Sequence, residues 1–237
     1  MRLTPLVLAF MAAALLPLSA AANLLDDGNL SLATTGTQTS NSALTLVVNF
    51  PDGSDPAARF QTGFANAQNT GVGGTEAPGT GTGVWFRSFE GDQGNSGEPL
   101  ADAELSQSII APLSGEYTLD FVAGREVNHL SQQFFVELSS TSAGSVMVDL
   151  NAAAIPDGNL GGAASPNPGG TPFSLTLPGV LAGDTVTVRG AVIGGEDTVI
   201  PGGQSAFLDS FFLNVPEPTS AMLISLAAVG YVVRRRR

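Results

Sequence analysis

The chain has 237 residues, of which 43% are hydrophobic and 13% are charged. The hydrophobic fraction is large enough for a folded core, whereas the charged fraction lies well below the roughly 25% of an average soluble domain. Between residues 23 and 214 there are four arginines, no lysine and 20 acidic residues, a net charge of −16. Such a surface repels phosphate backbones, which excludes nucleic-acid binding, and it tolerates divalent cations. Without cysteine the chain has no disulfide, no thiolate metal site and no cysteine nucleophile.

Residues 1–22 have the pattern of a secretory signal peptide. An arginine near the start is followed by an apolar run over residues 6–16, and small residues at 20–22 suit signal peptidase. A retained membrane helix is the alternative, but it needs roughly 20 apolar residues, and Pro5 and Pro17 bracket a shorter run. We therefore expect cleavage by signal peptidase after residue 22 and export across the inner membrane.

The region that follows has the two-residue periodicity of β-strands. Its apolar segments are short, rich in β-branched and aromatic residues, and separated by clusters of Gly, Pro, Asn and Asp, as expected of strands. We predict nine strands, at residues 43–50, 83–89, 105–110, 116–123, 133–138, 145–150, 173–177, 185–192 and 206–214.

Several of these segments alternate between an apolar and a polar face. Tyr117, Leu119 and Phe121 share one face of their segment, and Val186 and Val188 point inward from theirs. One-sided burial of this kind is typical of antiparallel sheets that pack face to face. We predict an all-β fold, an antiparallel β-sandwich of the jelly-roll type.

Residues 23–214 are expected to form a single domain. No internal repeat divides them, and two long Gly-rich stretches, 64–83 and 156–172, are predicted to be surface loops.

The C-terminal segment, residues 215–237, carries three signals in order. Pro216, Glu217 and Pro218 end the folded region, an apolar run at 221–233 predicts a short transmembrane helix, and four arginines follow, Arg234, Arg235, Arg236 and Arg237. A helix of this length spans only about 20 Å of a hydrocarbon core about 30 Å thick. The arginines would stay in the cytoplasm, which leaves the body outside.

This order of Pro-Glu-Pro, apolar helix and arginine cluster resembles the PEP-CTERM sorting signal of Gram-negative bacteria. The resemblance implies recognition by a membrane-embedded exosortase and cleavage at or near Pro216-Glu217-Pro218. It also implies delivery to the cell surface or extracellular matrix, often in species that make extracellular polysaccharide. A plain C-terminal anchor is the alternative, and it explains the helix and the arginines but not the Pro-Glu-Pro placed before them.

A second resemblance involves three segments of the body. Residues 104–110 and 112–125 resemble the central hairpin of galactose-binding-like sandwich domains, in which a glutamine-containing strand precedes a Gly-x-Tyr-Thr-Leu-x-Phe strand that ends near an arginine. Residues 204–213 resemble the last strand of that family, in which an aspartate, here Asp209, follows an apolar pair. The resemblance implies that Asp209 can join a structural cation site.

Catalytic chemistry finds little support in the sequence. His129 is the only histidine, no Gly-x-Ser-x-Gly motif accompanies it, and its surroundings predict a solvent-exposed loop residue. Adjacent carboxylates such as Glu90 with Asp92, or Glu196 with Asp197, would suit glycoside hydrolysis if they faced each other across a cleft. Acidic residues in Gly-rich loops are more often solvated turn residues. We therefore predict no enzymatic activity.

Two kinds of binding site are compatible with the residues. Glu90 and Asp92 lie in a turn-rich segment with clustered oxygen donors, and with Asp209 they are our candidate ligands for a structural calcium ion. Ordinary Asx turns are the alternative. Trp85, the sole tryptophan, shares its face with Arg87 and is a candidate for stacking on a sugar ring, although a lone tryptophan in a sandwich is more often part of the core.

The sequence thus predicts an exported, exosortase-sorted, non-catalytic protein of the cell surface or extracellular matrix, with a structural or adhesive role. Extracellular polysaccharide is the candidate ligand, and the membrane is a partner through the C-terminal tail before processing. The alternative is a secreted glycoside hydrolase that processes the polysaccharide of the same matrix.

Overall fold

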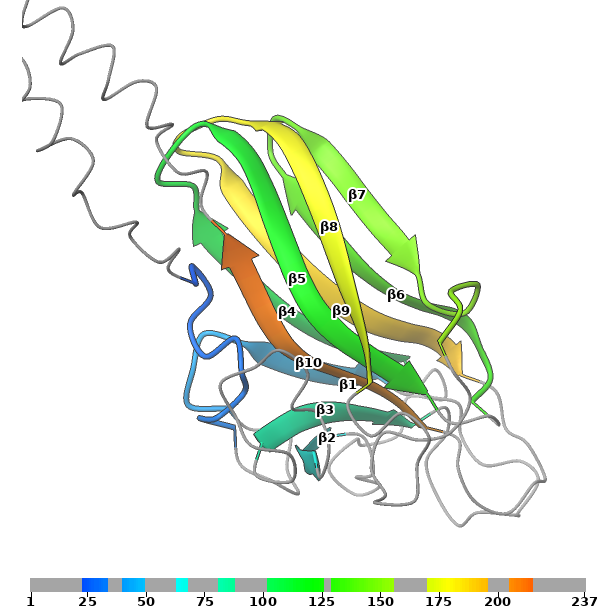
Figure 1. The fold of residues 1–237 in the computed structure, drawn as a ribbon. Coiled ribbons are helices and arrows are strands. Elements are labelled where there is room, and N and C mark those ends of the chain that lie inside the picture. The colour runs from blue at the N-terminus through cyan, green and yellow to red at the C-terminus, as the bar shows by residue number, and fades with distance from the viewer. Residues whose placement is uncertain are drawn as a thin grey trace, which may run out of the picture.

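The computed structural model describes residues 23–33, 40–49, 63–67, 81–87, 102–125, 129–155, 170–195 and 205–214. Ten strands lie in this part of the chain (Figure 1): β1 (Thr45–Asn49), β2 (Gly63–Ala67), β3 (Gly81–Arg87), β4 (Asp102–Ile110), β5 (Gly115–Arg125), β6 (Ser131–Ser140), β7 (Gly144–Asp149), β8 (Thr171–Val180), β9 (Thr185–Gly195) and β10 (Ser205–Asn214). The predicted signal peptide and the C-terminal helix lie outside the described residues. Within them, no helix is long and apolar enough to cross a membrane.

The strands form two five-stranded sheets, in which all neighbours are antiparallel. One sheet has the order β1-β4-β9-β6-β7 and the other the order β2-β3-β10-β5-β8. From β3 to β10 the chain changes sheet at every step except the β6–β7 hairpin, which is the strand order of a jelly roll. The all-β sandwich expected from the sequence is confirmed.

Each of the nine predicted strands coincides with an observed one, but β2 lies where we predicted a loop. The loop prediction for residues 64–83 is wrong at both ends, because β2 and the first residues of β3 fall inside it. The sequence of β2, Gly-Phe-Ala-Asn-Ala, has low intrinsic strand propensity. Its five residues pair in register with β3, so backbone pairing at the sheet edge, rather than side-chain preference, accounts for the strand.

The core lies between the two sheets and contains the residues that alternation assigned to it. Tyr117, Leu119 and Phe121 of β5 and Val186 and Val188 of β9 are all buried. Burying a side chain of this size contributes about 1.5–3 kcal/mol relative to leaving it in water. Aromatic rings also line up within one sheet, where the ring of Phe121 stacks 5.5 Å from that of Phe173 and 5.9 Å from that of Phe211.

A β-bulge in β10 adjusts which of its residues enter the core. The register with β5 shifts between Asp209 and Phe212, and Ser210 at the bulge has a φ of 54°. With strict alternation Phe211 would lie on the opposite face from Leu208. The extra residue instead lets both point inward, where Phe211 is 2% exposed and Leu208 is fully buried.

The connection between β4 and β5 is a corner and not a hairpin. β4 pairs with β1 and β9, whereas β5 pairs with β10 and β8, so the two strands lie in different sheets and the predicted central hairpin is wrong. At the corner the hydroxyl of the buried Tyr117 donates to the carbonyl oxygen of Leu113 at 2.8 Å, and the N–H of Leu113 lies 3.4 Å from the same hydroxyl. The two segments share a core but no ladder, which a pattern of alternation does not distinguish.

Candidate functional site

Trp85 lies on the outer face of the β2-β3-β10-β5-β8 sheet. It is 37% exposed, while its neighbours Val84 and Phe86 are fully buried. The prediction that favoured a core position for Trp85 is therefore wrong, whereas its separation from the face of Val84 and Phe86 agrees with the alternation of β3. The sole tryptophan is directed outward because the two neighbouring positions already supply the apolar side chains that the core holds at this strand.

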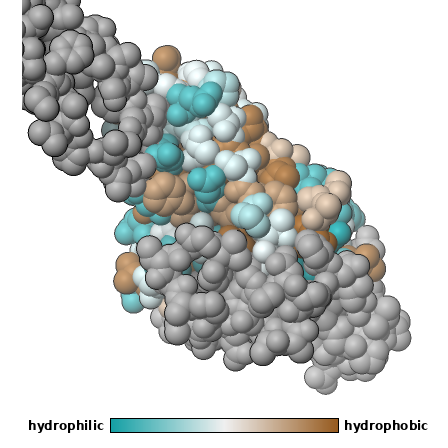
Figure 2. All heavy atoms as spheres, in the orientation of Figure 1, coloured by the Kyte–Doolittle hydropathy of each residue, from teal (hydrophilic) through white to brown (hydrophobic). Residues whose placement is uncertain are grey.

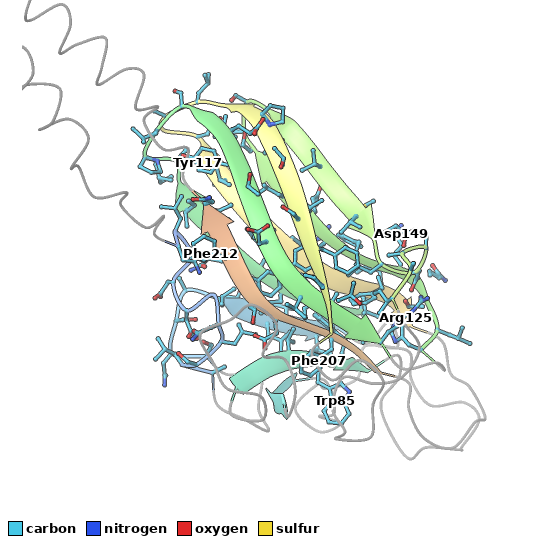
Figure 3. The ribbon with its side chains drawn as sticks, viewed as in Figure 1. Trp85, Tyr117, Arg125, Asp149, Phe207 and Phe212 are labelled. Carbon is cyan, nitrogen blue, oxygen red and sulfur yellow. The ribbon has the colours of Figure 1, made fainter. Side chains whose placement is uncertain are left out.

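Phe207 of β10 supports the Trp85 surface from beside it. The two residues are direct partners in the β3–β10 ladder, and Gly124 of β5 is the next residue of that row. A Cβ added to Gly83 would come within 2.5 Å of Cε1 of Phe207, so the phenyl ring lies over this glycine. Figure 3 shows Trp85 and Phe207 together at the end of the body opposite Tyr117. Trp85 thus stands exposed on this outer face beside the buried Phe207, far from the β4–β5 corner.

The backbone of Arg87 belongs to β3 and pairs with Ser205. Its side chain lies outside the described part, so its predicted place beside Trp85 stays a prediction.

The candidate calcium ligands are not brought together in the described part of the chain. Asp209 is 2% exposed on β10, and its Oδ1 accepts the N–H of Ser210. Glu90 and Asp92 lie outside the described residues, and within those residues no group of three or more His, Asp or Glu side chains is placed to hold a metal ion. Asp27, near the start of the body, acts as a turn acceptor, because its carboxylate accepts the hydroxyl of Ser31 and the N–H of Leu32, each at 2.8 Å.

His129 is buried and not solvent-exposed, which corrects the prediction. It is 5% exposed, and its ring packs edge-on against Phe134 with centroids 5.5 Å apart. Its Nε2 lies 3.1 Å from the hydroxyl of Ser131. The side-chain amide of Asn151 donates to the carbonyl oxygen of Ser131 at 2.9 Å, and Arg125 donates to the carbonyl oxygen of Asn151 at 2.9 Å. These contacts join the ends of β5 and β7 to the start of β6, which is a structural role.

The sequence did not reveal a charged cluster on the outer face of the other sheet. Arg189 of β9 pairs with Glu104 of β4 at 2.6 Å and lies 3.8 Å from Glu137 of β6. Its guanidinium stands 5.0 Å from the ring centre of Phe135, a cation–π contact. The alternation of β9 puts Arg189 on the face opposite Val186 and Val188, but the strands that carry its partners are distant in sequence, so the cluster becomes visible only in the sheet order.

The arrangement of Arg189, Glu104 and Glu137 bears on the hydrolase alternative. Two carboxylates on one face would be needed to flank a sugar, and Glu104 and Glu137 are such a pair. Both are directed at one guanidinium, which occupies the space between them. Among the described residues this pair of carboxylates is therefore bridged by an arginine and is not open to a substrate.

The chain is similar, at low identity, to several solved structures. TmCBM61 in complex with β-1,4-galactotriose is 14% identical, with a TM-score of 0.41 over 83% of this chain and 100% of that one. The K3 cleaved adhesin domain of Lys-gingipain from Porphyromonas gingivalis is 14% identical, with a TM-score of 0.43 over 82% of this chain and 100% of that one. No curated protein matches the chain.

The C-terminal segment matches a family model directly. Residues 214–237 match the model of the PEP-CTERM protein-sorting motif, which includes Pro216, Glu217, Pro218 and the four terminal arginines. The resemblance found in the sequence is confirmed: the chain carries a PEP-CTERM protein-sorting motif at its C-terminus.

Proposed function

We propose that this chain is a non-catalytic surface or extracellular-matrix protein whose β-sandwich binds polysaccharide on the outer face around Trp85. In this proposal the signal peptide is removed after residue 22 and an exosortase cleaves at Pro216-Glu217-Pro218. The motif match supports export and sorting. The binding part rests on one observation, the outward position of Trp85 beside Phe207.

The physical case for binding is the shape and chemistry of this surface. A tryptophan offers a large flat apolar face with a polar N–H at its edge, which suits a sugar ring whose C–H groups and hydroxyls lie on different sides. Phe207 is only 4% exposed, so its ring is already fixed in the fold. A site that is rigid before binding loses less entropy when the ligand arrives.

The binding proposal can be tested by affinity electrophoresis of the body in gels that contain polysaccharide from the matrix of the cells that produce this protein. The polysaccharide should retard the body, residues 23–214. Its affinity for the polysaccharide should fall roughly tenfold in Trp85→Ala, a loss of about 1.4 kcal/mol in binding free energy. Trp85→Phe keeps a ring and should lose less. Met147→Ala is the matched control, because Met147 is 57% exposed on the other sheet. Affinity electrophoresis in which Trp85→Ala migrates like the unchanged body would contradict the site.

A structural calcium ion at Glu90, Asp92 and Asp209 stays a prediction. If the body binds one, removing it with EDTA lowers the melting temperature, since a ligand of the native state alone stabilises that state. An unchanged melting temperature would dismiss the ion.

A further inference from the structure

The two ends of the described body lie side by side. The side-chain amide of Asn23 donates to the carbonyl oxygen of Phe211 at 2.9 Å, and its Oδ1 accepts the N–H of Leu213 at 2.9 Å. The N–H of Leu24 also donates to the carbonyl oxygen of Leu213 at 3.0 Å. Since β10 ends at Asn214, the predicted start of the mature chain and the start of the sorting motif lie at the same end of the sandwich.

Three loops form this end of the sandwich, and we call them the proximal tip: residues 111–114, 141–143 and 181–184. The β4–β5 and β8–β9 connections meet there (Figure 1), where the N–H of Ala111 donates to the carbonyl oxygen of Asp184 at 2.8 Å. The N–H of Ala182 donates to the hydroxyl of Ser114 at 2.8 Å. Hydroxyls of the β6–β7 turn reach the Asp184 carboxylate. The tip is therefore tied into one unit.

Large apolar side chains stand exposed at or beside the proximal tip. Ile110 is 65% exposed, Leu181 is 54% exposed and Leu113 is 41% exposed. Hydrophobic residues are visible at the same end in Figure 2. Leu113 is held in place by its bonds to the Tyr117 hydroxyl, and Ile110 pairs with Thr185 in the ladder. These side chains are therefore held outward by the backbone.

The charge of the proximal tip differs from that of the body. Asp184 is the only charged residue in the three loops, whereas the body as a whole carries four arginines against 20 acidic residues. Its carboxylate accepts hydrogen bonds from Ser140, Thr141 and the N–H of Leu181. With Glu116 exposed at its edge, a surface that has three exposed apolar side chains and whose own loops carry one hydrogen-bonded carboxylate suits the interface of a lipid bilayer better than it suits bulk water.

The length of the tail fixes how far the proximal tip can stand from the membrane. Six residues, 215–220, separate Asn214 from the predicted transmembrane run at 221–233. A fully extended chain of six residues spans at most about 20 Å. On the amino-terminal side the predicted cleavage position directly precedes Asn23, with no spacer. The bilayer is therefore the surface nearest to this end before processing.

We propose that the proximal tip is a membrane-facing surface, at which Ile110, Leu113 and Leu181 enter the headgroup region of the inner membrane while the tail anchors the chain. The proposal rests on the sorting function and adds an orientation to it. The body then stands with its long axis away from the bilayer, and cleavage at Pro216-Glu217-Pro218 releases the tip from the lipid.

The absence of cysteine from the chain makes a direct test available. Single variants Leu113→Cys and Leu181→Cys of the full-length chain are labelled with the environment-sensitive dye NBD and reconstituted, one copy each, in nanodiscs of phosphatidylethanolamine and phosphatidylglycerol. Leu130→Cys is the matched control. Leu130 is 46% exposed but directly precedes Ser131, which pairs with Gly195 at the far end of β9.

The expected result is a blue shift of the emission at positions 113 and 181, with quenching by lipids that carry a quencher on the acyl chain, and neither effect at position 130. With the label at 113, Leu181→Asp should weaken the shift, whereas Leu130→Asp should not. If the labels at 113 and 181 behave like the label at 130 in chains that stay in the nanodisc, the membrane-facing surface is disproved. The sorting role of the tail is unaffected by that result. Chains that fail to insert into the nanodisc overturn both.

Discussion

Tyr117 holds the corner at which the chain passes from one sheet to the other. Its ring is fully buried. Its hydroxyl donates a hydrogen bond to the carbonyl oxygen of Leu113 and lies near the N–H of the same residue. Tyr117→Phe keeps the ring and leaves these backbone groups without that partner. We expect a loss of about 1–2 kcal/mol in the free energy of unfolding, measured from the midpoint of urea unfolding.

Ser108→Ala is the matched control for this variant. It removes the hydrogen bond between Ser108 and Thr187, which is exposed, and a surface change of this kind shifts stability by no more than about 0.5 kcal/mol. Equal midpoints for Tyr117→Phe and Ser108→Ala would show that the corner hydrogen bond does not stabilise the fold.

Asp184 makes the stability of the proximal tip depend on pH. Hydrogen bonds hold the pKa of this carboxyl below its ordinary value of 3.8, first that from Ser142, then the N–H of Leu181, then Thr141 and Ser140. Because the pKa is lower in the folded state, the stabilisation is fully present above the unfolded value of about 4 and is lost as the pH falls through the folded value. The Asp184→Asn variant should therefore have a lower melting temperature than the unchanged chain at neutral pH.

Melting curves over a pH series check this sign. The difference in melting temperature between the two proteins should shrink as the pH falls below about 4. A difference that grows on acidification would contradict the lowered pKa.

At this scale alternation is a better guide than residue identity. The alternation of β3 puts Trp85 on a different face from Val84 and Phe86, as observed, whereas the preference of lone tryptophans for the core pointed the wrong way. His129 was placed wrongly in solvent, because its burial depends on contacts with Phe134 and Ser131, and a segment without periodicity does not show which ring will cover it.

The bulge of β10 is the element on which the packing of the last strand depends. Ser210 has a positive φ there, a conformation that β-branched residues rarely adopt. We expect Ser210→Val to lower the free energy of unfolding by about 1–2 kcal/mol, because the left-handed conformation is unfavourable for it. Ser210→Gly should be neutral or stabilising, since glycine adopts this conformation freely.

Thr176→Val is the control for the bulge variants, because Thr176 lies in β8, where its pairing with Thr118 of β5 is regular. Valine is favoured in a strand, so the urea midpoint should change little. If Ser210→Val and Thr176→Val shifted it equally, the strain at the bulge would be disproved.

Strands whose own residues prefer the extended state could be predicted, and the others could not. β5 and β9 alternate clearly and were found, although their ends extend further than predicted. β2 has no such signal and owes its conformation to β3. The bulge in β10 could not be predicted either, because its register is imposed by a neighbouring strand and nothing in the local sequence marks it.

On the scale of the whole molecule, the sandwich separates two surfaces. Trp85 and Phe207 lie near the start of β10, whereas Asn23 lies near its end, where Asn214 precedes the sorting tail in the sequence. Gly190 lies where the sheets meet, since a Cβ there would come within 2.4 Å of Cδ1 of Leu208. A protein anchored by its tail would therefore present the Trp85 face away from the membrane.

Sequence patterns predict the layered architecture but not the pairing of strands. The nine predicted segments and their inward faces were sufficient for a sandwich. The Arg189 cluster was not predictable, because Glu104 lies 85 residues before Arg189 and meets it only through the β4–β9 ladder.

The central claim is that the tail sorts the chain, and its most direct test is the fate of a tail variant in a host that contains exosortase. Replacing Pro216, Glu217 and Pro218 by alanine leaves the apolar run and the arginines in place. Mass spectrometry of the membrane and extracellular fractions should find this variant at full length in the inner membrane, and the unchanged chain shortened and outside it. Release of the variant in the same shortened form as the unchanged chain would contradict the account.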